Sequence, residues 1–195
     1  MNTKAMRTVV AAAMGVLFAS FLACSGAPPS KSQVDQQRTM IRDMADQTLA
    51  QLYKQYPAAR AAVETAAGYA VFSDFGMKFL FLGGAGGHGE AVDDATKKVT
   101  YMKMVELQPG FGFGAQNFRI VFIFATPQAF NQFVTSGWEF GANAMAAAKT
   151  STQGAGAQMG ATVAPGVTMY QLSEQGAIVG ISITGAKYYK NDQLN

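Results

Sequence analysis

The sequence predicts an α+β domain in which a bent antiparallel β-sheet, or a barrel-like sandwich, packs against helices. Apolar side chains recur at helical spacing over residues 33–56, and a second helical signal follows near residue 127. Between them, after Gly68, the chain turns to β-branched and aromatic residues punctuated by glycine, which is typical of strands and turns. With 195 residues, 49% of them hydrophobic, the chain suits one well-buried domain.

Two helices are expected before Gly68. The first runs from Gln33 to Tyr56 and is uninterrupted by proline or glycine. Pro57 fits the first turn of a second, alanine-rich helix, because proline tolerates the start of a helix, where its missing N–H would be unsatisfied anyway.

The middle of the chain predicts strands and one further helix. The expected strands are Tyr69–Phe72, Phe79–Gly84, Val99–Val105, Gly112–Gln116 and Arg119–Phe124, with a turn at residues 93–96. Thr126-Pro127 is an N-cap followed by a proline at the first helical position, so a helix is expected over about 127–135.

The last third of the chain is less regular. Residues 138–144 alternate in a way that suits a strand, although their alanines also suit a helix, and residues 150–165 suit an edge strand or a loop. A closing hairpin is expected from Val167–Leu172 and Ala177–Tyr188, with its turn at residues 173–176.

The first 23 residues have the layout of a secretory signal. Lys4 and Arg7 precede a charge-free apolar stretch, Thr8 to Ala23, which is shorter than the ~20 residues that a membrane-spanning helix needs. Phe21-Leu22-Ala23-Cys24 resembles the lipobox of bacterial lipoproteins, which implies cleavage before Cys24 and acylation of its thiol.

Cys24 is the single cysteine, so an intramolecular disulfide is excluded and a lipid anchor accounts for its presence. We therefore expect a signal peptide over 1–23, a lipidated spacer over 24–32 and one domain over 33–195. Because Ser25 follows the cysteine where aspartate would favour inner-membrane retention, we expect the outer membrane, with the domain facing the periplasm.

Net charge excludes one class of partner. The formal charge is +3, and loss of Lys4 and Arg7 with the signal leaves 13 basic against 12 acidic residues, or +1. Such a nearly neutral domain lacks the clustered basic charge that nucleic-acid binding requires.

Catalytic and cofactor motifs are weak. Residues 84–89 match the GxGxxG pattern, but an acidic segment follows in place of a phosphate-facing helix, so no dinucleotide is expected. His88 is the single histidine and has no recognisable triad or metal partners, and Asp93-Asp94 falls in a turn. We expect no enzyme, no cofactor and no metal.

Basic residues interleaved with apolar ones are the candidate binding residues. Lys78, Lys97, Lys98, Lys187 and Lys190 adjoin apolar or aromatic positions, as at a membrane interface. The alternative is a solvated sheet edge that lysines protect from aggregation, and the residues by themselves favour it.

A set of ordered motifs resembles one known family. Gly68-Tyr69-Ala70-Val71-Phe72, Gly112-Phe113-Gly114-Ala115-Gln116 and Gly185-Ala186-Lys187-Tyr188-Tyr189 are similar to those of SYLF domains, and the likeness spans about residues 40–190. The resemblance implies a lipid-binding module that contacts anionic phospholipids such as phosphoinositides. In eukaryotic relatives a basic amphipathic amino-terminal helix makes this contact, so Arg38 and Arg42 join the candidates, although Asp35, Asp43 and Asp46 dilute their charge.

The expected function is therefore reversible binding of anionic phospholipids by a membrane-anchored, non-catalytic lipoprotein. Actin binding, known for some eukaryotic members, is not carried over, because the expected compartment contains no actin. Two rivals stay open: a structural or assembly lipoprotein that acts through protein contacts, and a hydrolase or oxidoreductase built around His88.

The anchor is tested by Cys24→Ser. Because no second cysteine can accept the lipid, this change should abolish acylation and release the protein from the membrane fraction. Metabolic labelling with a palmitate analogue measures the outcome, and equal labelling of the parent and the variant would contradict a lipidated Cys24.

Overall fold

The computed structural model describes residues 29–73, 86–106, 118–140, 160–173, 178–179 and 186–195. These contain the helices α2 (Lys31–Gln55), α3 (Ala58–Glu64) and α4 (Pro127–Ser136). The strands are β1 (Gly68–Ser73), β2 (Gly86–Asp93), β3 (Val99–Glu106), β4 (Phe118–Phe124), β5 (Trp138–Phe140), β6 (Ala161–Ala164), β7 (Val167–Ser173), β8 (Ile178–Val179) and β9 (Ala186–Lys190). In this part of the chain no helix is long and apolar enough to cross a membrane.

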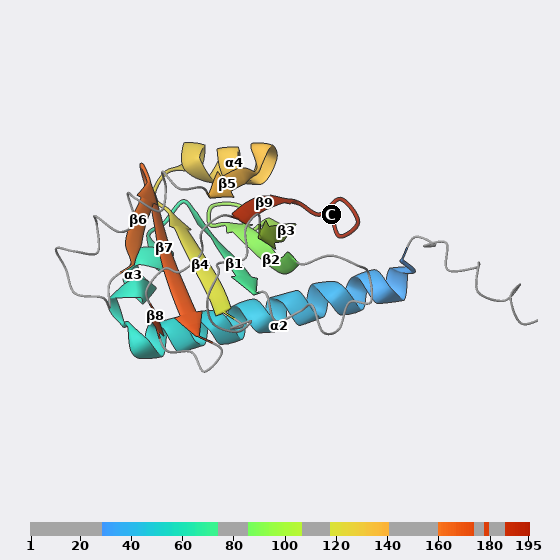
Figure 1. Cartoon of the computed structure of the whole chain (residues 1–195), viewed down its shortest axis with the longest axis horizontal. Coiled ribbons are helices and arrows are strands. Elements are labelled where there is room, and N and C mark those ends of the chain that lie inside the picture. Colours follow the sequence, from blue (N-terminus) through green and yellow to red (C-terminus); the bar gives the residue numbers. More distant parts are fainter. Residues whose placement is uncertain (1–28, 74–85, 107–117, 141–159, 174–177, 180–185) are drawn as a thin grey trace, which may run out of the picture. The chain divides into compact units, whose positions relative to one another are not determined.

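The strands form one antiparallel sheet in the order β5-β9-β3-β2-β1-β4-β7-β6, and β8 also pairs with β7 (Figure 1). β1 lies at the centre, with Val71 opposite Glu90 of β2 and Val121 of β4. The expected α+β class with an antiparallel sheet is confirmed.

Both faces of the sheet are buried, and alternation along each strand divides the side chains between them. Val71 and Val121 belong to the apolar cluster formed with α2 and α3. Their neighbours Phe72 and Phe122 belong to the cluster on the other side, which includes Phe133 of α4. The amino-terminal helices therefore cover one face and α4 covers the other (Figure 1).

The predicted helices are confirmed. Their regularly spaced apolar residues are the ones that pack against the sheet. The α2 residues Ile41, Ala45, Leu49 and Leu52 are buried, and α3 buries Ala59 and Val63. At the start of α4 the Ala129 amide donates to Thr126 Oγ1 at 3.3 Å, and Pro127 takes the first turn. This capping bond satisfies an amide that has no partner within the helix.

The strand predictions hold where the structure describes them, with one correction. The described parts of the strand expected over Ala177–Tyr188 pair with different strands: Ile178 pairs with Leu172 of β7, whereas Tyr188 pairs with Met104 of β3, on the far side of β1. Sequence periodicity says which residues alternate but not which strand they pair with, because pairing is decided by distant residues. The predicted strands Phe79–Gly84 and Gly112–Gln116 lie outside the described residues.

Aromatic rings fill the core beneath α4. The Phe72 ring centre lies 4.8 Å from that of Tyr188, and Phe122 lies 5.1 Å from Tyr188, both edge to face. Gly89 makes room for them, because a Cβ atom at this position would come 2.5 Å from Phe72 Cδ1 and still closer to the Val71 carbonyl oxygen. The glycine-rich segment 86–89 is thus strand, paired with β1 and β3, and not a phosphate-binding turn.

Gly89→Ala should therefore destabilise the fold. The added methyl group must displace the Phe72 ring and the β1 backbone, and overpacking of this kind costs about 1–3 kcal/mol. Urea unfolding followed by circular dichroism measures the change, with the exposed-site variant Thr162→Ala as the control. Equal midpoints for the two variants would show that the core adapts without cost.

Candidate functional site

A row of polar side chains crosses the sheet on the face that carries α2. Arg119 of β4, Ser73 of β1, His88 of β2, Lys103 of β3 and Tyr189 of β9 lie at directly opposed positions in successive strand pairs. Their sequence neighbours Ile120, Phe72 and Met102 point into the core beneath α4. Alternation therefore turns the whole row, called here the polar row, toward the α2 side.

At the inner end of the polar row, Arg119 holds helix α2. Its Nη1 donates to Gln51 Oε1 at 3.0 Å and to Thr48 Oγ1 at 3.4 Å. The Arg119 guanidinium thus links β4 to α2 through these hydrogen bonds.

His88 lies in the middle of the row, and its pKa is lowered. Burial lowers the pKa of its imidazole, and the nearby Lys103 ammonium lowers it further. Its Nδ1 atom is buried without a hydrogen-bond partner in the part of the chain that the structure describes. The same residues contain no group of three or more His, Cys, Asp or Glu side chains that could hold a metal ion.

At the outer end, an aromatic ring stands among lysines. Tyr189 lies opposite Lys103, and Lys187 lies on the same side of β9 two residues away. Directly opposed positions on an antiparallel pair place Cβ atoms about 4.5–5.5 Å apart. We call Lys103, Lys187 and Tyr189 the edge patch.

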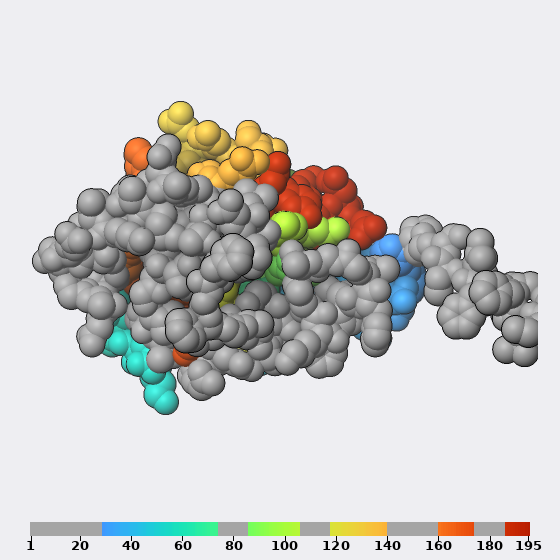
Figure 2. Space-filling model, viewed as in Figure 1, coloured from blue at the N-terminus to red at the C-terminus, as the bar shows by residue number. Residues whose placement is uncertain are grey.

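Lys187 and Tyr189 of the edge patch are exposed, and Lys103 is partly exposed. Tyr189 is 36% exposed and, with Met40, makes up the exposed large hydrophobic residues of the described chain. Lys187 Nζ contacts Glu139 Oε1 at 3.0 Å, but both side chains are at least half exposed, so solvent screens this pair. Figure 2 shows the carboxyl-terminal residues, in red, at the surface beside α4, in gold.

A second polar group lies one row further along the same face, beneath α2. Glu90 is 5% exposed, and its Oε2 atom has no hydrogen-bond partner within the described residues. Burial raises the pKa of the Glu90 carboxyl from 4.5 to about 7, with Arg42 opposing the shift and Asp46 adding to it. Near neutral pH this carboxyl is therefore divided between its protonated and charged forms.

The predicted arginines gather over Tyr101, the residue opposite Glu90. The guanidinium carbons of Arg38 and Arg42 lie 5.7 and 5.8 Å from the centre of the Tyr101 ring, within the range of cation–π attraction. Arg38 Nε also donates to the Leu194 carbonyl oxygen at 3.0 Å. Both arginines thus hold α2 against β3 and the carboxyl-terminal residues.

The predicted lysines do not form one surface. Lys97 and Lys98 lie in the turn between β2 and β3, where Lys97 Nζ pairs with Asp94 Oδ1. Lys187 faces the α2 side of β9, whereas Lys190, opposite Met102, faces the other side. Lys78 and Cys24 lie outside the described residues.

Lys103 is one of the basic residues that the sequence interleaves with apolar ones, although it is not in the set of lysines singled out above as candidates. Alternation with the core residues Met102 and Met104 was a local signal that its side chain points away from the α4 core. Its place beside Tyr189 had no local signal, since β9 comes to β3 from the end of the chain.

The described residues form an α+β domain with one antiparallel sheet, helices on both of its faces, and a patch of lysines and an aromatic ring near one edge. Residues 105–195 match the model of the Ysc84 family, described as Las17-binding protein actin regulator. The carboxyl-terminal part of the chain is thus similar to a family of binding domains, and the predicted SYLF resemblance is confirmed.

The chain is also similar to beta cell expansion factor A of Aeromonas veronii. The two are 35% identical over 159 residues, which is 80% of this chain and 58% of that protein's length. The chain thus spans little more than half of this relative.

The Glu90 carboxyl predicts how stability depends on pH. The folded protein retains a proton that the unfolded chain releases between pH 4.5 and about 7, so stability should fall as pH rises through this range. One pKa unit corresponds to about 1.4 kcal/mol, so the fall should be about 1–3 kcal/mol.

Glu90→Gln should remove this fall and make the protein more stable than the parent at pH 8. Urea unfolding at pH 5 and pH 8 measures the difference, and Glu139→Gln, an exposed carboxyl, serves as the control. A Glu90→Gln variant whose stability changes between the two pH values as much as the parent's does would contradict the raised pKa, because the lowered pKa of His88 acts in the opposite direction in both proteins.

Proposed function

We propose that this protein is a non-catalytic, lipid-anchored lipoprotein of the bacterial envelope whose SYLF domain binds anionic phospholipids, with phosphoinositide-like headgroups as the model ligand. It is held at the outer membrane through acylated Cys24, with the domain in the periplasm. Its partners are membrane phospholipids, and it needs no cofactor.

The edge patch carries this proposal. An exposed tyrosine suits the boundary between headgroups and acyl chains, because its ring is apolar and its hydroxyl is polar. Lys103 and Lys187 share its face of the sheet, and each basic side chain near an anionic surface contributes about 1 kcal/mol. Lys97 and Lys98 in the β2–β3 turn, and Lys190 on the other side of β9, lie outside this patch.

The proposed anchor makes such a weak contact effective. Lys31, where α2 begins, follows Cys24 by seven residues. A fully extended segment of that length spans about 25 Å. A domain tethered this closely meets the membrane at a high effective concentration, so a patch of few contacts suffices.

No catalytic role is assigned to His88. A triad histidine is oriented by a charged acid, whereas the cross-strand neighbours of His88 are Ser73 and Lys103. The nearest acid on its own strand face, Glu90, has its pKa raised to about 7 by burial. The described residues around His88 thus include no stable carboxylate that would hold an imidazolium.

The rival function, assembly through protein contacts, would favour an exposed apolar patch without lysines. Within the described residues the exposed large hydrophobics are Met40 and Tyr189, and Tyr189 has lysines beside it. This arrangement supports lipid as the partner.

Two double variants with equal loss of charge test the proposal. Lys103→Gln with Lys187→Gln should weaken binding to anionic vesicles by about 2 kcal/mol, or roughly thirtyfold, and flatten its salt dependence. Lys97→Gln with Lys98→Gln, in the β2–β3 turn, should lose less because no exposed ring adjoins those lysines.

Flotation of the Cys24→Ser chain with phosphatidylinositol phosphate vesicles and with phosphatidylcholine vesicles, each at two salt concentrations, gives the comparison. Equal losses from both variants would show attraction by overall charge and remove the edge patch from the contact. Equal flotation of parent and variants with both vesicle types would overturn anionic lipid binding.

A further inference from the structure

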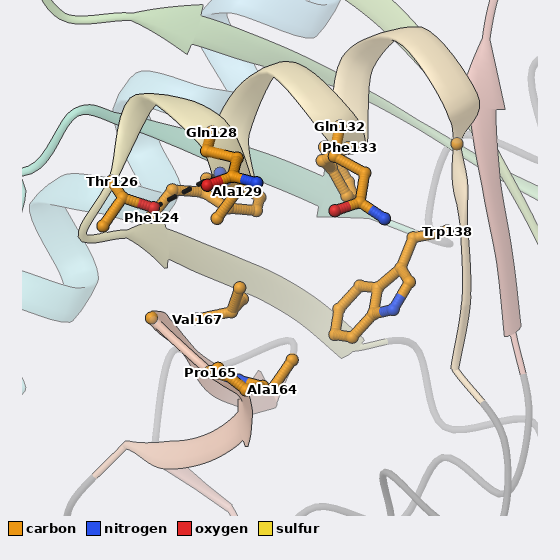
Figure 3. A pocket seen from close by; sticks show the side chains of 12 residues that line it. Phe124, Thr126, Gln128, Ala129, Gln132, Phe133, Trp138, Ala164, Pro165 and Val167 are labelled. Atoms are coloured by element: carbon orange, nitrogen blue, oxygen red, sulfur yellow. Dashed lines mark hydrogen bonds between the residues drawn. The ribbon is translucent and has the colours of Figure 1, made fainter.

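A pocket of about 570 Å³ lies between α4 and the hairpin that joins β6 to β7 (Figure 3). It is on the face of the sheet opposite the polar row and shares no residue with the edge patch. Its volume falls within the range of about 300–1,000 Å³ that is usual for small-molecule sites.

Two left-handed glycines set the walls of the pocket. Gly137, at φ 71°, ends α4 and directs the chain to Trp138, and Gly166, also at φ 71°, turns the β6–β7 hairpin. The Gly166 carbonyl oxygen accepts from the Ala125 amide at 2.8 Å, which ties the hairpin to the segment before α4. A Cβ atom at Gly137 would lie 2.5 Å from the Tyr188 carbonyl oxygen, so a larger residue cannot take its place.

The lining has no charged residue and combines buried or half-buried apolar side chains with exposed polar ones. Phe124 and Phe133, 1% and 3% exposed, belong to the core beneath α4, and the half-buried Trp138 packs against that core. None of the twelve lining residues is Asp, Glu, Lys, Arg or His. Such a lining admits an apolar molecule and offers no counter-charge to an ion buried within it.

Polar groups lie along one wall. Gln128 and Gln132 are exposed and stand one turn apart on α4, opposite the hairpin residues Ala164 and Val167 (Figure 3). Their amides can donate hydrogen bonds to an oxygen at the pocket mouth while the rest of the ligand remains among rings and methyl groups. The pocket thus suits an elongated apolar molecule with one polar end.

We propose that this pocket binds the acyl chain of a single-chain fatty acid, with its carboxyl end toward Gln128 and Gln132. A flexible chain fits an irregular space between a helix and a hairpin without a fixed shape of its own. Burial of its methylene groups is the favourable contribution to binding, so the affinity should increase with chain length until the pocket is filled.

Trp138, the one tryptophan of the chain, reports on occupancy. In the Cys24→Ser chain, which carries no acyl group of its own, 12-bromododecanoic acid should quench Trp138 fluorescence saturably at equimolar stoichiometry, below the concentration at which the acid aggregates. Unbrominated dodecanoic acid should not quench and should displace the brominated acid. Absence of saturable quenching would overturn the proposal.

Ala164→Phe should fill the pocket and weaken quenching at least tenfold, whereas Thr162→Phe, at an exposed position of the same strand, should leave it unchanged. Equal quenching of the two variants would refute binding at this place. If circular dichroism shows that Ala164→Phe does not fold, Ala129→Leu, which fills the same space from α4, takes its place. It should likewise weaken quenching, and unchanged quenching would refute binding in this pocket.

Two further measurements distinguish binding in the pocket from binding at the edge patch and from insertion of Trp138 into a bilayer. Lys103→Gln with Lys187→Gln should leave quenching by the free acid unchanged, so the failure of the edge patch and that of the pocket are distinguishable. Vesicles of brominated phosphatidylcholine should not quench Trp138. Quenching by the vesicles without quenching by the free acid would place a bilayer chain at Trp138 and contradict the single-chain proposal.

Discussion

Burial of the sheet on both faces is the constraint on which the other features depend. Adjacent residues of the central strands point to opposite sides, so Val71 and Val121 need α2 and α3, while Phe72 and Phe122 need α4. The polar side chains of these strands therefore lie beyond the residues that the helices cover with apolar side chains. One such group is the polar row, whose outer members, Lys103 and Tyr189, lie near the sheet edge.

The same constraint explains the unusual state of Glu90. Its position in β2 places Glu90 beneath α2. There the guanidinium groups of Arg38 and Arg42 stack on the Tyr101 ring and hold the helix against β3. A carboxyl group enclosed in this way loses hydration, and Arg42 offsets that loss incompletely because the pKa remains at about 7. Helix α2, which packs against the central strands, thus disfavours the charged form of Glu90 on β2.

The two faces of the sheet also divide the proposed chemistry. On the α2 side, lysines and a tyrosine offer contacts to anionic headgroups at a surface. On the α4 side, an uncharged pocket with aromatic walls offers space for an apolar chain. Strand alternation allows one sheet to present both, since residues one position apart in sequence, such as Tyr188 and Tyr189, belong to opposite sides.

The sequence by itself determined the local elements and the family resemblance. Helical spacing predicted α2, Thr126-Pro127 predicted the start of α4, and ordered glycine and aromatic motifs predicted the SYLF resemblance, because these signals involve residues close together in the chain. The tertiary structure decided the pairing of β9 with β3, which separates Lys187 from Lys190 and brings Lys103 to Tyr189. It also decided the burial of Glu90 and the pocket at Trp138. Each of these depends on contacts between residues distant in sequence, whose pairing no local pattern specifies.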